Sequence, residues 1–357
     1  MTPTDPAAPA PEPPTDPLDE AKPDPRAEAA AEALAEKLAA GDRRALARGV
    51  TLIESTRPDH RRAAAALVRR LHALPRKTLR LGLSGTPGVG KSTFIEAFGL
   101  QLAEQGHRLA VLAVDPSSAR TGGSILGDKT RMERLSRHPN AFIRPSPSGA
   151  ALGGVARRTR EAILLCEAAG FDLVMVETVG VGQSETMVAE MTDIFLLLMA
   201  PAGGDELQGV KRGIMEICDM ILVNKADGDL KATAERTRAD YASALRLLRG
   251  RPQDPNGFPK AAAVSAVSHA GLEAAWKEIE GLAEWRRETG VLEARRREQA
   301  VAWFRAEVEE ALLRRFRRHP AVAELWPRLE TTVAAGDTPP QLAAAKALAA
   351  FGLGEED

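Results

Sequence analysis

Short apolar runs alternate with loop signals through the middle of the chain, and helical segments separate most of them. A strand that is buried on both faces of a parallel sheet has this continuous apolar character. The pattern predicts an α/β fold, in which an open, mostly parallel sheet carries helices on both sides. The predicted strands are Leu79–Ser84, Leu109–Asp115, Ala141–Arg144, Asp172–Glu177, Ile194–Met199, Met220–Asn224 and Ala261–Ser265.

Helical patterns flank this sheet region, which we place at residues 78–290. Residues 26–77 are rich in Ala, Leu, Arg and Glu, and their helical pattern is interrupted twice. This predicts three short helices packed on the main domain. Residues 291–357 predict a helical extension with an apolar stripe from Trp303 to Phe316, which packs on its own domain or pairs with another subunit. Residues 1–25 contain nine prolines and predict a disordered tail.

The composition narrows the class of protein. The formal net charge of −1 gives no sign of a general nucleic-acid or membrane-surface binder. The two cysteines, Cys166 and Cys218, lie in apolar stretches without metal-ligand spacing, so we interpret them as buried thiols. The chain has no run of 18 apolar residues and no basic-then-apolar amino terminus, so we expect a cytoplasmic protein.

A phosphate-binding motif of the type G-x-x-x-x-G-K-[ST] follows the first predicted strand and opens a helix. Its glycines let backbone N–H groups converge on phosphate oxygens at the positive end of the helix dipole. Lys91 is predicted to reach the β- and γ-phosphates, and the Ser92 hydroxyl to ligate Mg²⁺. The predicted phosphate-binding residues are Gly85, Thr86, Pro87, Gly88, Val89, Gly90, Lys91, Ser92 and Thr93.

A second motif predicts guanine as the base. Asn224, Lys225, Ala226 and Asp227 follow an apolar strand and fit the pattern N-K-x-D. The Asp227 carboxylate accepts from the guanine N1–H and 2-amino group, which adenine lacks in that arrangement, and such a site rejects the wrong base by about 10⁴-fold or more. After the last strand, Ser265, Ala266 and Val267 form the loop whose backbone N–H is expected to meet guanine O6.

Two acidic residues at strand ends are candidates for metal binding and catalysis. Asp115 is predicted to hold a Mg²⁺-bound water or to orient the attacking water, with helix capping as the alternative. Glu177-Thr178-Val179-Gly180 stands where GTPases usually carry D-x-x-G, and its longer acidic side chain still allows water-mediated contact with Mg²⁺. Val181 replaces a water-positioning Gln, so we expect slow intrinsic hydrolysis unless Gln183 or a partner supplies that function.

Two glycine-rich polar loops, 120–131 and 203–212, are predicted on the nucleotide side of the sheet. Loops of this kind beside a γ-phosphate are typical order–disorder switches. Lys129 or Arg131 is either an internal analogue of an arginine finger or a solvated loop charge.

Several stretches of the sequence are characteristic: GLSGTPGVGKSTFIEAFG, VLAVDPSS, GGSILGDKTRM, VETVGVGQSE, GGDELQGVKRGI and NKAD. They resemble the MeaB/ArgK family of GTPase chaperones for methylmalonyl-CoA mutase. The resemblance spans roughly residues 40 to 330. It implies a G domain of the signal-recognition and metal-insertion type, and a homodimer formed through carboxy-terminal helices. It also implies a partner, an adenosylcobalamin-dependent acyl-CoA mutase, for which the GTPase gates cofactor delivery and which it protects from inactivation. By the same resemblance, Ser92, Asp115, Asp128 and Glu177 form the Mg²⁺ shell, and the loop from Gly203 to Lys211 is a third switch facing the mutase.

Three alternatives stay open at this point. A nickel-insertion GTPase would carry Cys/His clusters, which the sequence lacks. A kinase for amino-acid transport proteins would use ATP, which the NKAD motif disfavours. A non-enzymatic module that binds nucleotide for structure alone is disfavoured by the complete phosphate and metal motifs.

Overall fold

The protein is represented by a computed structural model that describes residues 25–55, 57–72, 74, 77–114, 132–145, 152–178, 184–201, 212–247 and 254–352. The predictions made for the proline-rich tail, for Asp115, Asp128 and Gln183, and for most of the two glycine-rich loops lie outside these residues.

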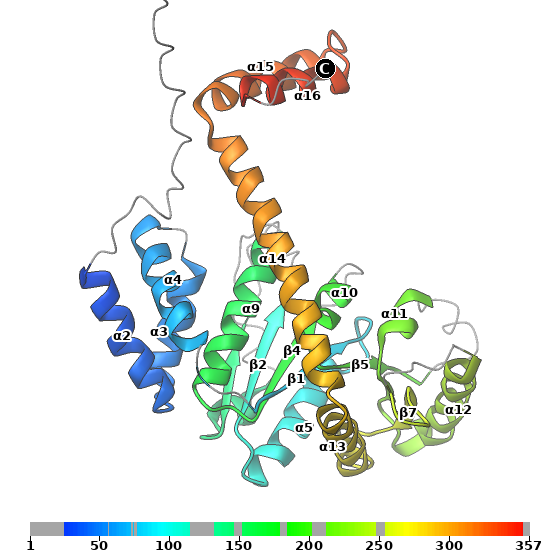
Figure 1. Ribbon diagram of the computed structural model, residues 1–357. Coiled ribbons are helices and arrows are strands. Elements are labelled where there is room, and N and C mark those ends of the chain that lie inside the picture. The colour runs from blue at the N-terminus through cyan, green and yellow to red at the C-terminus, as the bar shows by residue number, and fades with distance from the viewer. Residues whose placement is uncertain are drawn as a thin grey trace, which may run out of the picture.

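A parallel sheet lies at the centre of the molecule, which confirms the predicted fold class (Figure 1). Within the described residues it has seven strands in the order β3-β2-β4-β1-β5-β6-β7. β1 is the central strand, with β4, β2 and β3 on one side and β5, β6 and β7 on the other. Ligands of open α/β sheets bind where the chain changes side in this way, outside the carboxyl ends of the strands. The strands are β1 Leu79–Ser84, β2 Leu109–Val114, β3 Ala141–Arg144, β4 Leu173–Thr178, β5 Ile194–Met199, β6 Met220–Val223 and β7 Lys260–Ala263.

Helices cover both faces of the sheet because its strands are apolar on both sides. Leu81 and Leu83 of β1 face a core shared with α5 (Lys91–Glu104), α8 (Glu133–Arg137) and α13 (Leu272–Glu288). The opposite face packs against α9 (Leu152–Ala168), α10 (Ser184–Ala189), α11 (Arg212–Ile217) and α12 (Lys231–Leu247), and a 3₁₀ turn, Gly228–Leu230, precedes α12. Cys166 and Cys218 are both buried in this second core, as predicted, and burial raises the pKa of the Cys166 thiol.

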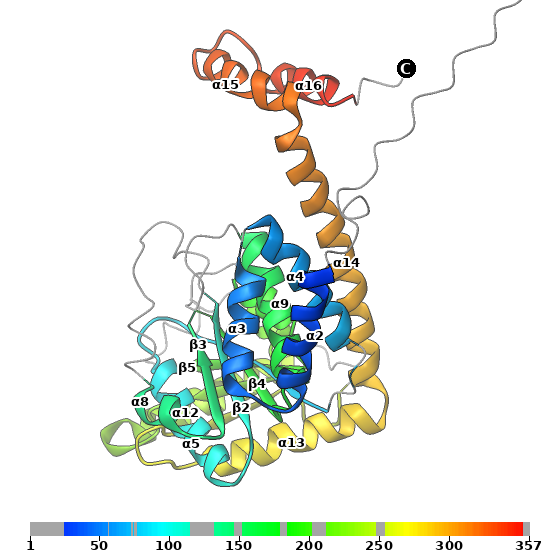
Figure 2. The same ribbon diagram turned by 90° about the vertical axis from the view of Figure 1, so that its left-hand side faces the viewer.

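The amino-terminal region forms three helices, α2 (Pro25–Ala39), α3 (Arg43–Glu54) and α4 (Pro58–His72). Asp42 caps α3 by accepting hydrogen bonds from the N–H groups of Arg44 and Ala45, at 2.7 and 3.1 Å. The group packs against α9, outside the sheet (Figure 2). Contact is close at Gly49, where an added Cβ would lie 2.8 Å from Leu165 Cδ2, so a larger residue here would require the Leu165 side chain to shift.

The carboxy-terminal helices form an arm that projects from the sheet domain (Figures 1 and 2). The long helix α14 (Val291–Arg318) leads to α15 (Pro320–Ala334) and α16 (Pro340–Ala350), which pack on each other at its far end. The predicted Trp303–Phe316 stripe divides between faces of α14. Trp303 lies between the Arg80 and Arg160 guanidinium groups, 5.8 and 5.5 Å from its ring centre, while Phe304 is 67% exposed. Phe316 packs against Trp326 and Phe351.

The base of the arm is held by buried charges at the amino edge of the sheet, opposite the nucleotide edge. Arg296 donates to the Asp193 carboxylate at 2.6 and 2.8 Å, just before β5 begins. Arg286, which is 1% exposed, donates to Asp219 at 2.6 Å and to Asp254 at 2.5 Å. A buried charge is tolerated only when it is paired and hydrogen-bonded, so these arginines fix where α13 and α14 leave the domain.

Among the described helices, none combines the length and the apolar character that crossing a bilayer requires.

Candidate functional site

The loop between β1 and α5 has the backbone that a phosphate cradle needs. Gly88 and Gly90 have φ values of 86° and 90°, a region that side-chain-bearing residues rarely adopt. Gly85 is buried, and a Cβ added there would lie 2.3 Å from the carbonyl oxygen of Leu198 on β5. The loop can therefore lie this close to the sheet edge only with glycine at position 85.

The start of α5 is suited to an anion. Its N-cap residue is Gly90, which provides no side-chain cap, so Lys91, Ser92 and Thr93 stand in the first turn, where backbone N–H groups lack helical partners. The Lys91 ammonium lies over the loop and donates to the carbonyl oxygens of Gly85 and Thr86, at 2.5 and 3.3 Å. Burial lowers the pKa of Lys91, while the carboxylates of Glu177 and Glu185 oppose this shift.

The predicted guanine loop contacts the phosphate loop directly. Asn224 is 1% exposed, and its side-chain amide donates to the carbonyl oxygen of Val89 at 3.0 Å. Its amide oxygen accepts from the N–H of Ala266 at 3.2 Å, so one side chain joins three loops. Lys225 has a φ of 59° and donates to the carbonyl oxygen of Gly88 at 2.8 Å. This arrangement extends the aliphatic part of Lys225 toward the phosphate loop.

The predicted base-reading carboxylate is held in place by a neighbouring loop. Ser265 is buried, and its hydroxyl donates to Asp227 Oδ1 at 2.5 Å. The same hydroxyl oxygen accepts from the N–H groups of Val267 and Ser268, at 3.2 and 3.0 Å. The structure therefore brings Asp227 next to the loop of Ser265, Ala266 and Val267, although Asp227 and Ser265 are 38 positions apart in the sequence.

Glu177 lies at the carboxyl end of β4, opposite Leu83 of β1, and is buried. Next to it, the Thr178 hydroxyl shares a 2.8 Å hydrogen bond with the hydroxyl of Ser84, the last residue of β1. Ser92 and Glu177 supply a hydroxyl and a carboxylate oxygen on neighbouring elements, and such hard oxygen donors fit Mg²⁺. The other two predicted ligands, Asp115 and Asp128, lie outside the described residues.

Two features of the site were not predicted. The Ser84–Thr178 pair lies at the ends of two adjacent strands, and a polar residue ending an apolar run was the only sequence signal for it. The hydrogen bond from Ser265 to Asp227 had no signal, because it depends on β6 and β7 being neighbours in the sheet.

Comparisons with known proteins agree with this geometry. The sequence model of the family described as methylmalonyl-CoA mutase-associated GTPase MeaB matches residues 46–321. A protein of Caulobacter vibrioides is 56% identical over 317 residues, which cover 89% of this chain and 96% of that protein. The mouse protein named methylmalonic aciduria type A homolog, mitochondrial, is 49% identical and aligns over 88% of this chain and 78% of its own length.

A solved structure is also similar. The crystal structure of a LAO/AO transport system kinase superposes with a TM-score of 0.70 at 36% identity, and covers 91% of this chain and 98% of that one. Since the family match includes both nucleotide loops and the sheet that carries them, the chain is a guanine-nucleotide-binding enzyme that hydrolyses GTP, and it belongs to the MeaB family of GTPases.

Proposed function

We propose that this GTPase is the chaperone of an adenosylcobalamin-dependent acyl-CoA mutase, in the first place methylmalonyl-CoA mutase, and that it gates cofactor delivery and protects the mutase. The observation that carries the proposal is the family match over residues 46–321, whose description names the mutase. The name of the mouse relative, which refers to methylmalonic aciduria, points to the same metabolism.

The proposed chemistry assigns a role to each group. The first turn of α5 and the Lys91 ammonium bind the phosphates, and Lys91 follows the charge that develops on the γ-oxygens. Asp227, held by Ser265, selects guanine. Ser92 and Glu177, with Asp115 and Asp128, would hold Mg²⁺, which neutralises phosphate charge when bound. Asp115 remains a proposed catalytic residue that orients the attacking water.

A homodimer is part of the proposal. Helix α14 exposes large apolar side chains, and a partner surface would remove them from water: Phe304, Val308, Leu312 and Leu313 are 67%, 42%, 57% and 56% exposed. Light scattering is expected to give about twice the chain mass, and a monomer at micromolar concentration would contradict the dimer. A cytoplasmic location stays a prediction, since the mouse relative is named mitochondrial.

The kinase alternative raised from the sequence corresponds to the name of a similar structure. It requires ATP, whereas Asp227 and its Ser265 partner form a guanine-reading arrangement. The metal-insertion alternative lacks support in the described residues, which hold no group of three or more His, Cys, Asp or Glu suited to a metal ion.

The test is to mix the purified full chain with methylmalonyl-CoA mutase from the same organism. We expect the mutase to accelerate GTP hydrolysis, and its affinity for the chain to differ between GDP and a non-hydrolysable GTP analogue. Other acyl-CoA mutases of the cobalamin class serve as comparisons. If none of them binds the chain or changes its hydrolysis rate, the chaperone proposal fails and the GTPase assignment remains.

A further inference from the structure

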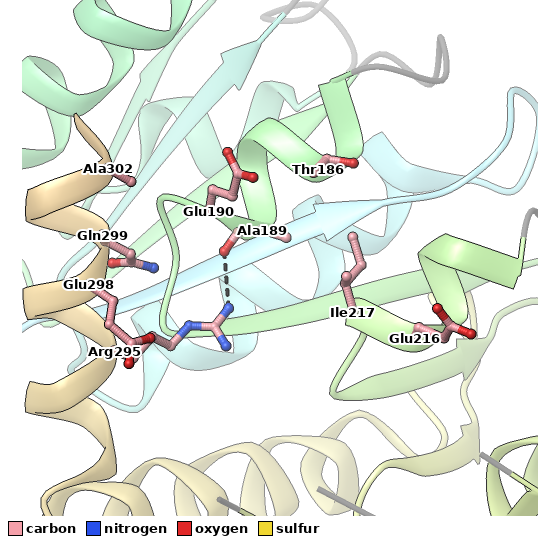
Figure 3. Close-up of a pocket in the computed structure, with 9 residues that line it drawn as sticks. All are labelled: Thr186, Ala189, Glu190, Glu216, Ile217, Arg295, Glu298, Gln299 and Ala302. Atoms are coloured by element: carbon pink, nitrogen blue, oxygen red, sulfur yellow. Dashed lines mark hydrogen bonds between the residues drawn. The ribbon is translucent and has the colours of Figure 1, made fainter. Parts of the chain in front are cut away.

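A pocket of about 400 Å³ lies between α10, α11 and the lower part of α14 (Figure 3). None of the described residues that line it belongs to the predicted nucleotide loops. However, α10 begins at Ser184, directly after the Glu177–Gln183 stretch, and α11 begins at Arg212, the last residue of the glycine-rich loop 203–212. Two of its walls therefore continue from segments that the sequence places beside the γ-phosphate, and the third wall is the arm.

The lining of the pocket is acidic. Glu190, Glu216 and Glu298 come from three different parts of its wall, and all three are exposed (Figure 3). Among the described residues that line it, Arg295 is the one cation, and this guanidinium is already engaged. It donates to the carbonyl oxygens of Ala189 and Thr192, at 3.0 and 3.1 Å. Among its described lining residues the pocket therefore has three carboxylates and one guanidinium, and Glu190 and Glu298 form no ion pair within the described part of the chain.

A buried acceptor in the same pocket independently calls for a donor. Gln299 is 7% exposed, and Figure 3 shows its amide projecting from α14 toward α10. Its Nε2 donates to the carbonyl oxygen of Thr192 at 2.9 Å, while its Oε1 has no hydrogen-bond partner among the described residues. A buried polar atom without a partner is costly, and a ligand that brings an N–H group removes that cost.

We propose that this acidic pocket receives an arginine side chain from the surface of the partner mutase. A guanidinium stays charged and has five N–H donors in a planar fork, so it can serve the carboxylates and the Gln299 oxygen together. An adjoining hollow shares Glu298 and Ala302 with the pocket and contains Val301 of α14, which is 50% exposed. Val301 offers apolar surface to the segment of the mutase that carries the arginine. This inference rests on the proposed chaperone function.

The pocket also gives a physical route between the nucleotide and the partner. Arg295 and Gln299 tie α14 to the end of α10 and to the connection that leads into β5. An arginine seated among α10, α11 and α14 contacts all three elements at once. If the nucleotide changes how α10 and α11 sit, it changes the affinity for that arginine, and by linkage the mutase changes nucleotide affinity.

The test measures the Kd of the full chain, loaded with a non-hydrolysable GTP analogue, for methylmalonyl-CoA mutase from the same organism. Glu298→Lys and Glu190→Lys place a cation at the rim of the pocket, and we expect each to raise the Kd at least about tenfold and to reduce the dependence of binding on salt. Glu280→Lys makes the same charge change on the exposed face of α13, outside the pocket, and should stay within about twofold of wild type.

Basal GTP hydrolysis should be unchanged in all three variants, because none of these residues contacts the nucleotide loops. An unchanged Kd for both pocket variants, with the wild type binding normally, would overturn the pocket proposal and leave the chaperone function intact. A loss of self-association without a loss of mutase affinity would also overturn it, since the occupant would then be a second copy of this chain. Absence of wild-type binding would instead reject the chaperone function itself.

Discussion

The side-chain amide of Asn224 donates a 3.0 Å hydrogen bond to the carbonyl oxygen of Val89, and this bond ties the guanine loop to the phosphate loop. The two residues are 135 positions apart in the sequence and lie after β1 and β6. Because the amide oxygen of Asn224 also accepts from the N–H of Ala266, one buried side chain links the predicted phosphate loop to both predicted guanine loops.

Replacing Asn224 with alanine should therefore separate the two halves of the nucleotide site. Asn224→Ala removes both hydrogen bonds and leaves the Val89 carbonyl and the Ala266 N–H without this partner, each at a cost of about 1–3 kcal/mol. We expect GTP affinity, measured by calorimetry, to fall at least about tenfold, with a lower Tm. An unchanged affinity would mean that the two loops are positioned independently.

Base selection should change with Asp227. Asp227→Asn replaces an acceptor oxygen with a donor, so the preference should shift from GTP toward xanthosine triphosphate, whose 2-oxo group accepts a hydrogen bond. Binding of both nucleotides to wild type and variant decides the point. Ser265→Ala keeps the carboxylate but removes its 2.5 Å hydrogen bond, so it should weaken GTP binding without reversing the preference. Equal wild-type affinity for ATP and GTP would exclude the guanine-reading role.

Hydrolysis should depend on Lys91. Lys91→Ala removes the cation that stabilises charge on the transferred phosphate, and kcat should fall at least about a hundredfold. Phosphate release by the purified variant measures this. Lys225→Ala also loses an ammonium that contacts the phosphate loop, at Gly88, but should mainly weaken binding. Wild-type turnover in Lys91→Ala would place the activity at another site.

Folding stability should depend on the buried arginine at the base of the arm. Arg286→Ala leaves Asp219 and Asp254 buried without their guanidinium partner, which should lower the free energy of unfolding by about 3–5 kcal/mol. Its exposed neighbour provides the control, since Arg287→Ala should change stability by less than about 0.5 kcal/mol. Urea unfolding measures the free energy of unfolding of both variants. Similar decreases in the two would show that the buried charge cluster contributes no more to stability than an exposed arginine.

The sequence by itself determined the nucleotide chemistry and most of the elements. Loops that recognise phosphate and guanine are short and contiguous, so the motifs G-x-x-x-x-G-K-S and NKAD are enough to predict this chemistry from the sequence. Strands buried on both faces are continuous apolar runs, and for this reason their predicted ends differ by only a residue or two from the observed ones, as in β2, which ends at Val114 instead of Asp115. The three amino-terminal helices followed from the breaks at Gly41-Asp42 and Arg57–Asp59.

Only the tertiary structure decided which distant residues meet. Ser265 orients Asp227 because β7 pairs with β6, and helical periodicity alone did not show that Trp303 turns toward Arg80 while Phe304 remains exposed. The buried Arg286 had the same appearance in the sequence as its exposed neighbour Arg287. The acidic pocket likewise draws Glu190, Glu216 and Glu298 from three separate parts of the chain. Periodicity and spacing describe one element at a time, whereas burial and charge pairing depend on how several elements pack together.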